Sequence, residues 1–468
     1  MGRTREAFYA WLVPRLVFPL SERLAGRRMW TEVCRLRDLQ WRSQEELEAR
    51  AVAKLRQLLI HAGTQVPYYR DLFKHTGLEP EAVRTSLDLA AVPITTKTDL
   101  RRHFPQHTVA DNLPAHRRRR MMTSGSTGLP FEFYWDRASA DALLGAYLFS
   151  LEWAGASIWD TRLAIASPSY FYTNVIGTSR CRQMARWIAL GERTVNLSAI
   201  DLTAAKFQMV VHRLGRQGRY FLRGYPSSTV HLAMQLLEEG TELLAYPKVV
   251  ITYAETLTAT NAASLRCAFH CAIVNYYSSW EVPQIAQTCP DNPEVLHVNT
   301  ERVILRVVRP DGTTAAPGEL GRVVLTDLAN SVMPFINYGI GDWAVVGPPC
   351  SCGRGFPTLT RLEGRDTEVI QTPGGKQING GVLGQFLAFV IGAIPYIWEY
   401  QAVQTAPDEI IVRVVPNTRF TPEFARTLQG ELEVFLGPGV RVTIEPVDRI
   451  PLEPSGKRFI IKSLLAQG

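Results

Sequence analysis

The chain has 468 residues, of which 46% are hydrophobic and 20% charged, as in ordinary folded proteins and unlike disordered ones. Its length exceeds the roughly 100–200 residues of a single domain, so two or three units are expected. Lys and Arg number 51 against 44 Asp and Glu, and the net charge of +7 suits anionic ligands such as nucleotides without by itself indicating nucleic acid.

The cysteines and the N-terminal residues indicate the cellular compartment. Seven cysteines, an odd number with scattered spacing, form no recognisable disulfide framework. The apolar stretch from Phe8 to Leu20 is broken by two prolines and an arginine, which is not the pattern of a secretory leader. The sequence contains no run of about 18 apolar residues, so we expect no membrane span. We therefore expect a cytoplasmic protein, with residues 8–24 packed on the core rather than lying along a membrane surface.

Residues 1–100 are predicted to be mostly helical. Ser43 and Glu46 have the spacing of a capping box, in which two side chains cap each other's backbone at the start of a helix. Apolar residues then recur on one helical face from Leu47 to Ala62, and Gly63 is placed to end the helix.

Between residues 121 and 345 short β-rich runs alternate with helical stretches. The runs are Leu163–Ala166, Val249–Tyr253, Ala272–Tyr276, Val303–Val308 and Arg322–Leu325. The helical stretches include Asp201–Leu214 and Thr229–Glu239. This alternation predicts an α/β fold with several sheets covered by helices in the large N-terminal part of the chain.

The pattern changes after a Gly/Pro-rich stretch at residues 371–376. Two predicted strands, Ile410–Val415 and Val440–Glu445, flank a helix that begins after Thr421 and ends at Gly437. We place a domain boundary between residues 366 and 367. It leaves a small α+β C-terminal domain of about 100 residues, a size that can fold on its own.

The first segment that indicates chemistry is Thr123–Pro130, with the sequence TSGSTGLP. Its two glycines allow successive N–H groups to turn toward one anion, and its four hydroxyl side chains add further donors. The spacing is not that of a Walker loop. Taken alone, the segment is equally compatible with a plain turn.

Four further segments follow it along the chain. They are Tyr277–Glu281, Tyr338–Asp342, Gly364–Glu368 and Pro454–Lys457. With residues 123–130 they resemble the ordered motifs of adenylate-forming enzymes: acyl- and aryl-CoA ligases, peptide-synthetase adenylation domains and luciferases. Within that superfamily the chain most resembles the phenylacetate–CoA ligase-like branch, which includes capsular polysaccharide biosynthesis-type proteins. Val66–Arg70 and Val92–Lys97 resemble that branch as well.

The resemblance implies an AMP-forming acid–thiol ligase. Such an enzyme uses ATP and Mg²⁺ to adenylate a carboxylic acid and then passes the acyl group to a thiol, with CoA as the expected acceptor. Residues 1–366 would form the ATP- and acid-binding adenylation domain, and residues 367–468 a mobile lid domain that carries the catalytic lysine. Two alternatives stay open: transfer to an amine, a carrier protein or another nucleophile in secondary-metabolite or polysaccharide biosynthesis, and a nucleotide-binding scaffold without turnover.

The motifs carry residues whose chemistry suits this reaction. Joining a carboxylate to ATP brings two anions together, so donors, a metal and a cation must offset their repulsion. The resemblance assigns Glu281 to Mg²⁺, which prefers oxygen ligands, with Thr127 as a helper. It assigns Lys457 to the transition state, where a flexible ammonium bridges the carboxylate and the α-phosphate. The residues that it assigns to the nucleotide are Thr123, Ser124, Gly125, Ser126, Thr127, Gly128, Tyr277, Ser278, Asp342 and Arg365. The alternatives are a surface acid at Glu281, a turn cap at Asp342 and a solvated Lys457.

Three positions depart from the family pattern. Leu129 stands where many relatives have lysine, so one phosphate-binding cation is missing from the segment. Ser278 replaces the common glycine after Tyr277. Thr367 stands at the hinge, where aspartate or lysine is common, but a hinge needs backbone freedom more than a particular charge.

The segments that line the acid pocket in this superfamily are rich in aromatic residues here. The predicted pocket residues are Phe171, Tyr172, Gly224, Tyr225, Tyr253, Tyr276 and Trp280. Their aromatic content favours a flat or apolar acid, aryl rather than alkyl, although aromatic side chains also commonly fill cores. Arg223 would pair with a second carboxylate of the substrate or with backbone.

Three cysteines and a histidine suggest a second metal site. Cys350 and Cys352 form a tight two-thiolate turn, and Cys289 and His297 lie upstream. Similar segments occur in the branch that the chain resembles, and four such ligands would make a closed zinc site of the structural type. The alternative is three reduced thiols and a surface histidine.

The densest charge cluster is Arg117–Arg120. Such a run could contact nucleic acid or the 3′-phosphate of CoA. It lacks the interleaved aromatic residues on which single strands stack, so we expect a solvated edge and no nucleic-acid partner. The expected partners are a small carboxylic acid and CoA or another acceptor. The oligomeric state stays open, with a homodimer among the alternatives.

Overall fold

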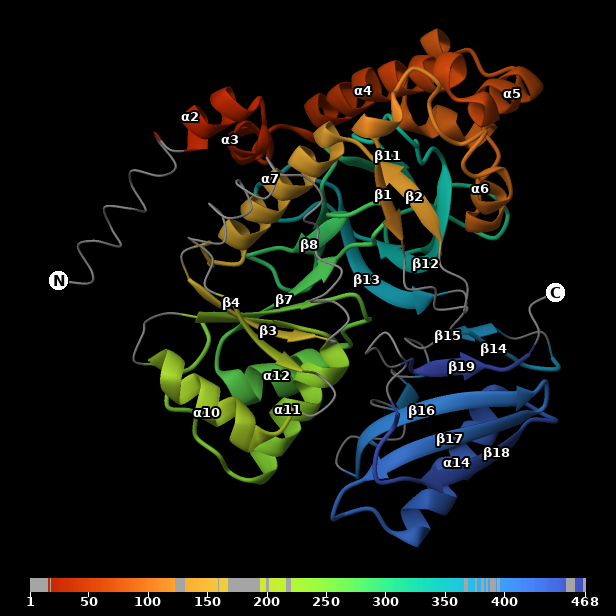
Figure 1. The fold of residues 1–468 in the computed structure, drawn as a ribbon. Coiled ribbons are helices and arrows are strands. Elements are labelled where there is room, and N and C mark those ends of the chain that lie inside the picture. Colours follow the sequence, from red (N-terminus) through yellow and green to blue (C-terminus); the bar gives the residue numbers. More distant parts are fainter. Residues whose placement is uncertain are drawn as a thin grey trace.

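The computed structural model describes most of the chain. The described residues are 16, 18–122, 131–158, 160–166, 194–198, 202–215, 220–365, 369–374, 377–379, 383, 386–387, 393, 396–451 and 459–465. Figure 1 shows them as a large unit of helices and strands and a smaller unit, in blue, at the C-terminal end. No helix within these ranges is both long and apolar enough to cross a bilayer.

Helices form the N-terminal part of the large unit, as predicted. They are α2 (Phe18–Ala25), α3 (Met29–Leu39), α4 (Gln44–Gln65), α5 (Pro67–Thr76) and, after two short 3₁₀ turns at Pro80–Ala82 and Ser86–Ala91, α6 (Lys97–His103). The predicted capping box of α4 is confirmed, since the backbone N–H of Glu46 donates to Ser43 Oγ at 3.1 Å and that of Ser43 donates to the Glu46 carboxylate at 3.2 Å.

The predicted end of α4 at Gly63 is wrong. The helix continues to Gln65, and Val66 leaves it with extended backbone angles. A residue that precedes proline is driven out of the helical region, and Pro67 follows here. Gly63 instead allows close packing, because a Cβ at this position would lie 3.2 Å from the ring of Phe73.

One sheet of eleven described strands crosses the large unit, in the order β10-β11-β12-β13-β9-β8-β7-β6-β5-β3-β4. The parallel half contains β3 (Thr161–Ala166), β4 (Thr194–Ser198), β5 (Tyr220–Gly224), β6 (Val249–Tyr253) and β7 (Ala272–Tyr277). The antiparallel half contains β8 (Ala286–Thr288), β9 (Leu296–Val298), β10 (Val303–Val308), β11 (Leu320–Asp327), β12 (Tyr338–Val346) and β13 (Thr358–Arg365). The strands predicted from β-rich runs all lie in this sheet.

Helices cover both faces of the parallel half (Figure 1). Successive residues of a strand point to opposite faces. Leu222 of β5 packs in a cluster with α10 (Ala204–Gly215), α11 (Pro226–Glu238) and α12 (Ala259–Phe269), whereas Phe221 packs with Leu151 of α7 (Arg137–Trp153). The helix predicted at 229–239 starts earlier than expected, because Pro226 is suited to a first helical turn. This α/β architecture confirms the predicted fold class.

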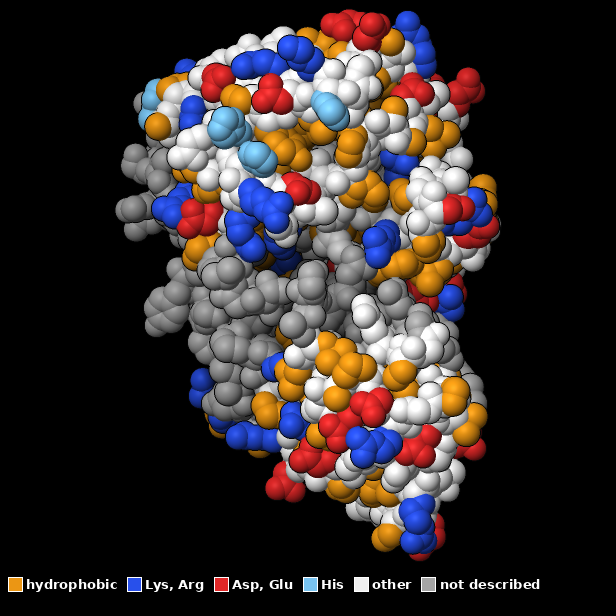
Figure 2. Space-filling model, turned by 90° about the vertical axis from the view of Figure 1, so that its right-hand side faces the viewer, with side chains coloured by type: hydrophobic (Ala, Val, Ile, Leu, Met, Phe, Trp, Pro, Cys, Tyr) orange, Lys and Arg blue, Asp and Glu red, His pale blue; other side chains and the backbone are white. Residues whose placement is uncertain are grey.

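A short hairpin precedes α7. Strand β1 (Arg119–Met122) follows a 3₁₀ turn at Ala115–Arg117 and pairs with β2 (Glu132–Trp135) in antiparallel register, with Met122 opposite Glu132. Two arginines of the basic cluster are engaged here, since Arg120 pairs with Glu132 and Arg118 donates to the Leu113 carbonyl at 2.7 Å. On the face drawn in Figure 2, acidic side chains are interspersed with Lys and Arg rather than excluded from a basic stripe.

The C-terminal unit has its own sheet and its own core. Its elements are β14 (Val369–Gln371), β15 (Gln377–Asn379), β16 (Ile397–Ala406), β17 (Glu409–Pro416), α14 (Pro422–Leu436), β18 (Arg441–Pro446) and β19 (Ile461–Ser463), and its main sheet has the order β18-β17-β16-β19. Thr421 caps α14 by accepting from the Phe424 N–H, and Leu428 and Leu432 of that helix are fully buried. His231 of α11 and Glu399 of β16 link the two units, with 3.3 Å between Nδ1 and the carboxylate.

Candidate functional site

The candidate active site lies where the parallel and antiparallel halves of the sheet meet. Tyr277 is the last residue of β7, and Asp342 lies in the middle of β12. The Tyr277 hydroxyl donates to Asp342 Oδ2 at 2.7 Å, and Asp342 is 9% exposed. Ligands of α/β proteins bind beyond the carboxyl ends of the strands, so the structure brings two predicted nucleotide residues together at such an end.

The loop after β7 is folded back on itself and carries Glu281. The Ile285 N–H donates to the Tyr277 carbonyl at 3.0 Å, and the Gln284 N–H donates to Ser278 Oγ at 3.2 Å. Ser278 therefore acts as an internal brace of the loop, a role that glycine in the same position would lack. Gln284 has a positive φ of 64°, which tightens the turn around Glu281.

Glu281 is buried, with 4% of its surface exposed, and lies beside a cation. Lys97 Nζ approaches Glu281 Oε1 to 2.8 Å, and the Tyr338 hydroxyl lies 3.5 Å from the same oxygen. Tyr338 begins the strand that also carries Asp342. A buried carboxylate needs such a partner to offset its lost hydration.

Sequence reasoning missed Lys97. The signal that could have found it was the stretch Val92–Lys97, which resembles the branch but was given no role. The structure ties this stretch to β12: the Thr95 N–H donates to the Asn337 carbonyl at 2.9 Å, and the Gly339 N–H donates to the Thr95 carbonyl at 3.0 Å. Lys97 is thereby held at the start of α6, beside Glu281.

Several predicted residues lie outside the described ranges. They are Thr123, Ser124, Gly125, Ser126, Thr127, Gly128, Leu129, Phe171, Tyr172, Thr367 and Lys457. Arg365 ends β13, and its backbone is paired with that of Asp342 in the neighbouring strand. The motifs that carry Asp342 and Arg365 are therefore adjacent in the sheet.

The described residues of the predicted acid pocket, other than Trp280, gather at the carboxyl ends of β5, β6 and β7. The rings of Tyr225 and Tyr253 lie 5.2 Å apart. The guanidinium of Arg223 lies over Tyr253 at 4.6 Å and over Tyr276 at 5.9 Å, measured to the ring centroids. Gly224 leaves no room for a side chain, since a Cβ would lie 2.5 Å from Thr229 Oγ1. Trp280 instead packs against the core cluster that contains Phe131 and Tyr338.

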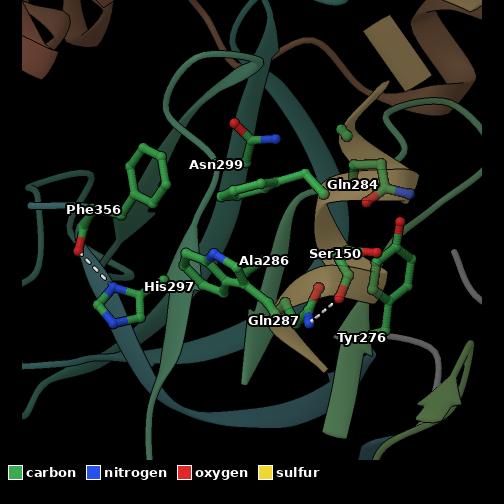
Figure 3. A pocket seen from close by; sticks show the side chains of 11 residues that line it. Ser150, Tyr276, Gln284, Ala286, Gln287, His297, Asn299 and Phe356 are labelled. Atoms are coloured by element: carbon green, nitrogen blue, oxygen red, sulfur yellow. Dashed lines mark hydrogen bonds between the residues drawn. The ribbon is translucent and has the colours of Figure 1, made fainter. Parts of the chain in front are cut away.

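A small cavity lies between α7 and strands β8 and β9, and Tyr276 forms part of its wall (Figure 3). Gln287 Nε2 donates to the Ser150 carbonyl there at 2.9 Å. The other residues that line the cavity are Ala146, Phe149, Trp153, Gln284, Ala286, His297, Asn299 and Phe356. Its volume of about 30 Å³ is enough to hold a water molecule. The cavity suits a buried water and is too small for an aryl acid.

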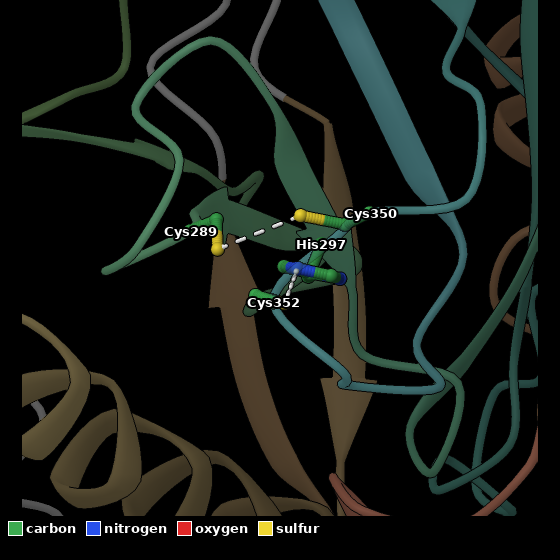
Figure 4. Close-up of side chains that lie close together, drawn as sticks. All are labelled: Cys289, His297, Cys350 and Cys352. Atoms are coloured by element: carbon green, nitrogen blue, oxygen red, sulfur yellow. Dashed lines mark hydrogen bonds between the residues drawn. The ribbon is translucent and has the colours of Figure 1, made fainter.

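The four predicted zinc ligands converge (Figure 4). Their ligand atoms all lie within 4.8 Å of one another, with Cys350 Sγ 3.9 Å from Cys289 Sγ and Cys352 Sγ 3.3 Å from His297 Nε2. A tetrahedral zinc ion with Zn–S bonds of about 2.3 Å separates two sulfurs by about 3.8 Å. The spacing of the sulfurs therefore fits a zinc ion.

The surroundings of the cluster suit a metal as well. His297 Nδ1 donates to the Phe356 carbonyl at 2.9 Å, which leaves Nε2 facing the cysteines. Burial lowers the pKa of His297, so the imidazole is kept in the neutral form that binds metals. Burial also raises the pKa of the Cys289 thiol to about 12, so a thiolate at this position calls for a neighbouring cation.

Comparisons with known proteins agree with this geometry. Residues 370–463 match the family model of the CapK C-terminal domain. Phenylacetate-coenzyme A ligase of Thermus thermophilus is 24% identical over 340 residues, which cover 71% of this chain and 73% of that protein. Protein CapK of Staphylococcus aureus is 22% identical over 405 residues, 85% of each chain. These similarities confirm the predicted resemblance to the phenylacetate–CoA ligase-like and CapK-type branch.

A solved structure has the same fold. The structure of 2-hydroxyisobutyryl-CoA ligase in its postadenylation state, with an acyl-adenylate bound, gives a TM-score of 0.72 at 20% identity and covers 90% of this chain and 91% of that one. The same protein in its thioesterification state gives 0.60.

Proposed function

We propose that this protein is an AMP-forming acid–CoA ligase that uses ATP. The observation that carries the proposal is the convergence of Tyr277, Glu281 and Asp342 at the carboxyl end of β7, from motifs far apart in the chain. The branch supports it, since relatives of this chain are named phenylacetate-coenzyme A ligases. In the first step the substrate carboxylate attacks the α-phosphate and pyrophosphate leaves. In the second a thiol attacks the acyl carbon and AMP leaves.

Each residue has a distinct task in this proposal. Asp342, held by the Tyr277 hydroxyl, would accept hydrogen bonds from the ribose hydroxyls and orient the nucleotide. Glu281 would hold Mg²⁺, which neutralises phosphate charge when it is bound. Lys457 would place its ammonium between the carboxylate and the α-phosphate as charge develops. Thr123–Gly128 would bind the phosphates, and the C-terminal domain, residues 367–468, would swing between the two steps.

The proposed acid carries a flat group, with aryl favoured over alkyl. Tyr225, Tyr253 and Tyr276 lie at the ends of neighbouring parallel strands, where acids bind in this superfamily. Arg223 lies against two of these rings, so a polar substituent on the acid would meet a cation. CoA is the proposed acceptor, and an amine or a carrier protein is the alternative. The predicted cytoplasmic location belongs to the same proposal.

Exchange of labelled pyrophosphate into ATP tests the first step. A panel of aryl, alkyl and sugar acids is assayed with Mg²⁺, and thiol and amine acceptors are then added to the active acids. We expect exchange that depends on one class of acid and thioester formation with CoA. Folded protein that binds ATP but gives no exchange with any acid would instead support a scaffold without turnover.

We also propose a structural zinc ion bound by Cys289, His297, Cys350 and Cys352, carried by the separation of their ligand atoms. Elemental analysis of the purified protein is expected to give one zinc per chain. Cys350→Ser should lose the metal, while Cys267→Ser, a change at an exposed cysteine outside this cluster, should retain it. Metal-free wild-type protein with full stability would contradict the proposal.

A further inference from the structure

Arg354 lies two residues after Cys352, in the turn that carries two of the proposed zinc ligands. Its backbone N–H donates to Cys352 Sγ at 3.5 Å. Its side chain is only 10% exposed and pairs with Asp291, which lies two residues after Cys289. A guanidinium is therefore buried beside the predicted ligand cluster.

The guanidinium lies against two tryptophan rings. Its Cζ is 4.7 Å from the ring centroid of Trp41 and 5.0 Å from that of Trp153. Trp41 follows the C-terminal end of α3, and Trp153 is the last residue of α7. A planar cation is attracted by aromatic faces, and the attraction is stronger where the cation is withdrawn from water.

One side-chain amide joins the same elements by hydrogen bonds. Gln40 Oε1 accepts from Arg354 Nε and from Trp153 Nε1, in both cases at 3.0 Å. The Gln40 backbone carbonyl accepts from the Gly355 N–H at 3.0 Å. Gly355 permits this approach, since a Cβ there would lie 1.8 Å from the Arg42 carbonyl oxygen. The cysteine turn is thus bonded to the ends of α3 and α7.

A zinc ion would give this buried cation a complementary charge. Zinc with three thiolates and a neutral imidazole leaves the site with one net negative charge. The other partner of Arg354, the Asp291 carboxylate, is 58% exposed and therefore screened by water. We propose that Arg354 couples the zinc site to α3 and α7, so that metal binding and the packing of both helix ends stabilise each other. The inference rests on the proposed zinc ion.

Zinc release into an excess of a chromogenic chelator tests the role of Arg354. Arg354→Gln removes the charge and should release zinc at least about tenfold faster than wild type, the scale on which groups behind the ligands change metal affinity. Arg354→Lys keeps the charge without the planar fork, so an intermediate rate is expected. Arg322→Lys is the matched control, because Arg322 of β11 lies over Trp343 at 5.5 Å. Its rate should equal that of wild type.

Gln40→Ala separates coupling through the helices from the charge of Arg354. The change leaves the guanidinium and the four ligands in place but removes the acceptor that Arg354 and Trp153 share. Loss of this acceptor should still speed zinc release by about fivefold. Cobalt-substituted protein should keep the absorption of a tetrahedral thiolate site in every variant, which would show that the ligands themselves are intact.

The coupling must also act in the opposite direction. Removal of zinc from wild-type protein should speed hydrogen exchange in residues 36–42, where the Gln40 N–H donates to the Leu36 carbonyl at 3.1 Å. In Arg354→Gln the same segment should exchange fast with or without zinc. A segment of α14, which packs in the separate C-terminal core, should not respond.

The outcomes distinguish this inference from the proposals on which it depends. Release from folded Arg354→Gln at the wild-type rate would overturn it and leave the zinc site in place. Zinc-independent exchange of residues 36–42 in wild type would also overturn it, and this measurement decides if the variant does not fold. Wild-type protein that binds neither zinc nor cobalt would reject the zinc site and the inference together. Pyrophosphate exchange tests the ligase function separately.

Discussion

Two buried carboxylates in the large unit, Glu281 and Glu301, are both paired with cations but lie in different parts of the fold. Both are 4% exposed. Glu301 faces several cations: Lys54 bonds to it directly, Arg35 lies at 3.0 Å and Arg50 at 3.7 Å. Glu281 lies beside Lys97, whose side chain is about as exposed as those of Arg35 and Arg50. Several cations converge on Glu301 from α3 and α4 and tie these helices to the sheet, whereas Glu281 lies in the loop after β7 at the candidate site, where a ligand can reach it.

Glu281→Gln tests the carboxylate at the candidate site and should have the largest effect. We expect pyrophosphate exchange to fall by about 10²–10³-fold, because the amide cannot stabilise charge on the bound phosphates through a metal. The melting temperature should change little, since glutamine can still accept a hydrogen bond from Lys97. Both are measured on the same preparation. A large drop in melting temperature would place Glu281 with Glu301 among the structural carboxylates.

Glu301→Gln tests this cluster and should cost about 1.5–3 kcal/mol of unfolding free energy, because it removes the charged hydrogen-bond acceptor shared by Lys54 and two half-exposed arginines. Denaturant unfolding measures this loss. Burial lowers the pKa of Lys54 in the folded protein. The unfolded chain therefore binds this proton more tightly than the folded protein does. The free energy of unfolding consequently increases as the pH rises toward the ordinary pKa of lysine. The variant should therefore recover part of its loss at high pH. An equal loss of unfolding free energy at neutral and high pH would contradict a lowered pKa of Lys54.

Asp342→Asn should weaken nucleotide binding without affecting the ion pairs of Glu301. Loss of a charged hydrogen-bond acceptor costs about 1.5–3 kcal/mol, so the KM for ATP is expected to rise by about 10–100-fold. The KM for the acid should be unchanged. Tyr277→Phe removes the bond that orients Asp342 and should give a smaller change of the same kind. A rise in the acid KM alone would show that Asp342 serves a different substrate.

Glu152→Gln is the smallest expected effect and calibrates the others. Glu152 pairs with Arg37 at 2.5 Å, but both side chains are more than one third exposed. Such surface pairs contribute about 0–1 kcal/mol. The variant should match the wild type in unfolding and exchange assays. A loss as large as that of Glu301→Gln would mean that burial is not what separates the two classes of carboxylate.

The confirmed predictions of strands and helix starts depend on patterns of residues close together in the sequence. The strands Val249–Tyr253 and Val303–Val308 were predicted to the residue, because runs of β-branched side chains suit a buried sheet. The capping box at Ser43 follows from a three-residue spacing. The end of α4 was predicted wrongly because the local signal that ends the helix is Pro67, not Gly63, which instead packs against Phe73.

By itself, the sequence determined which chemical groups this protein has, the order of its motifs and the positions of several helices and strands, since each depends on residues close together along the chain. Only the tertiary structure decided which groups meet. Tyr277 contacts Asp342, 65 positions away in the chain, and Cys352 contacts His297, 55 positions away. Lys97 of α6 contacts Glu281 in the loop after β7. These contacts depend on strand order and on how helices pack against the sheet, and no local spacing specifies either.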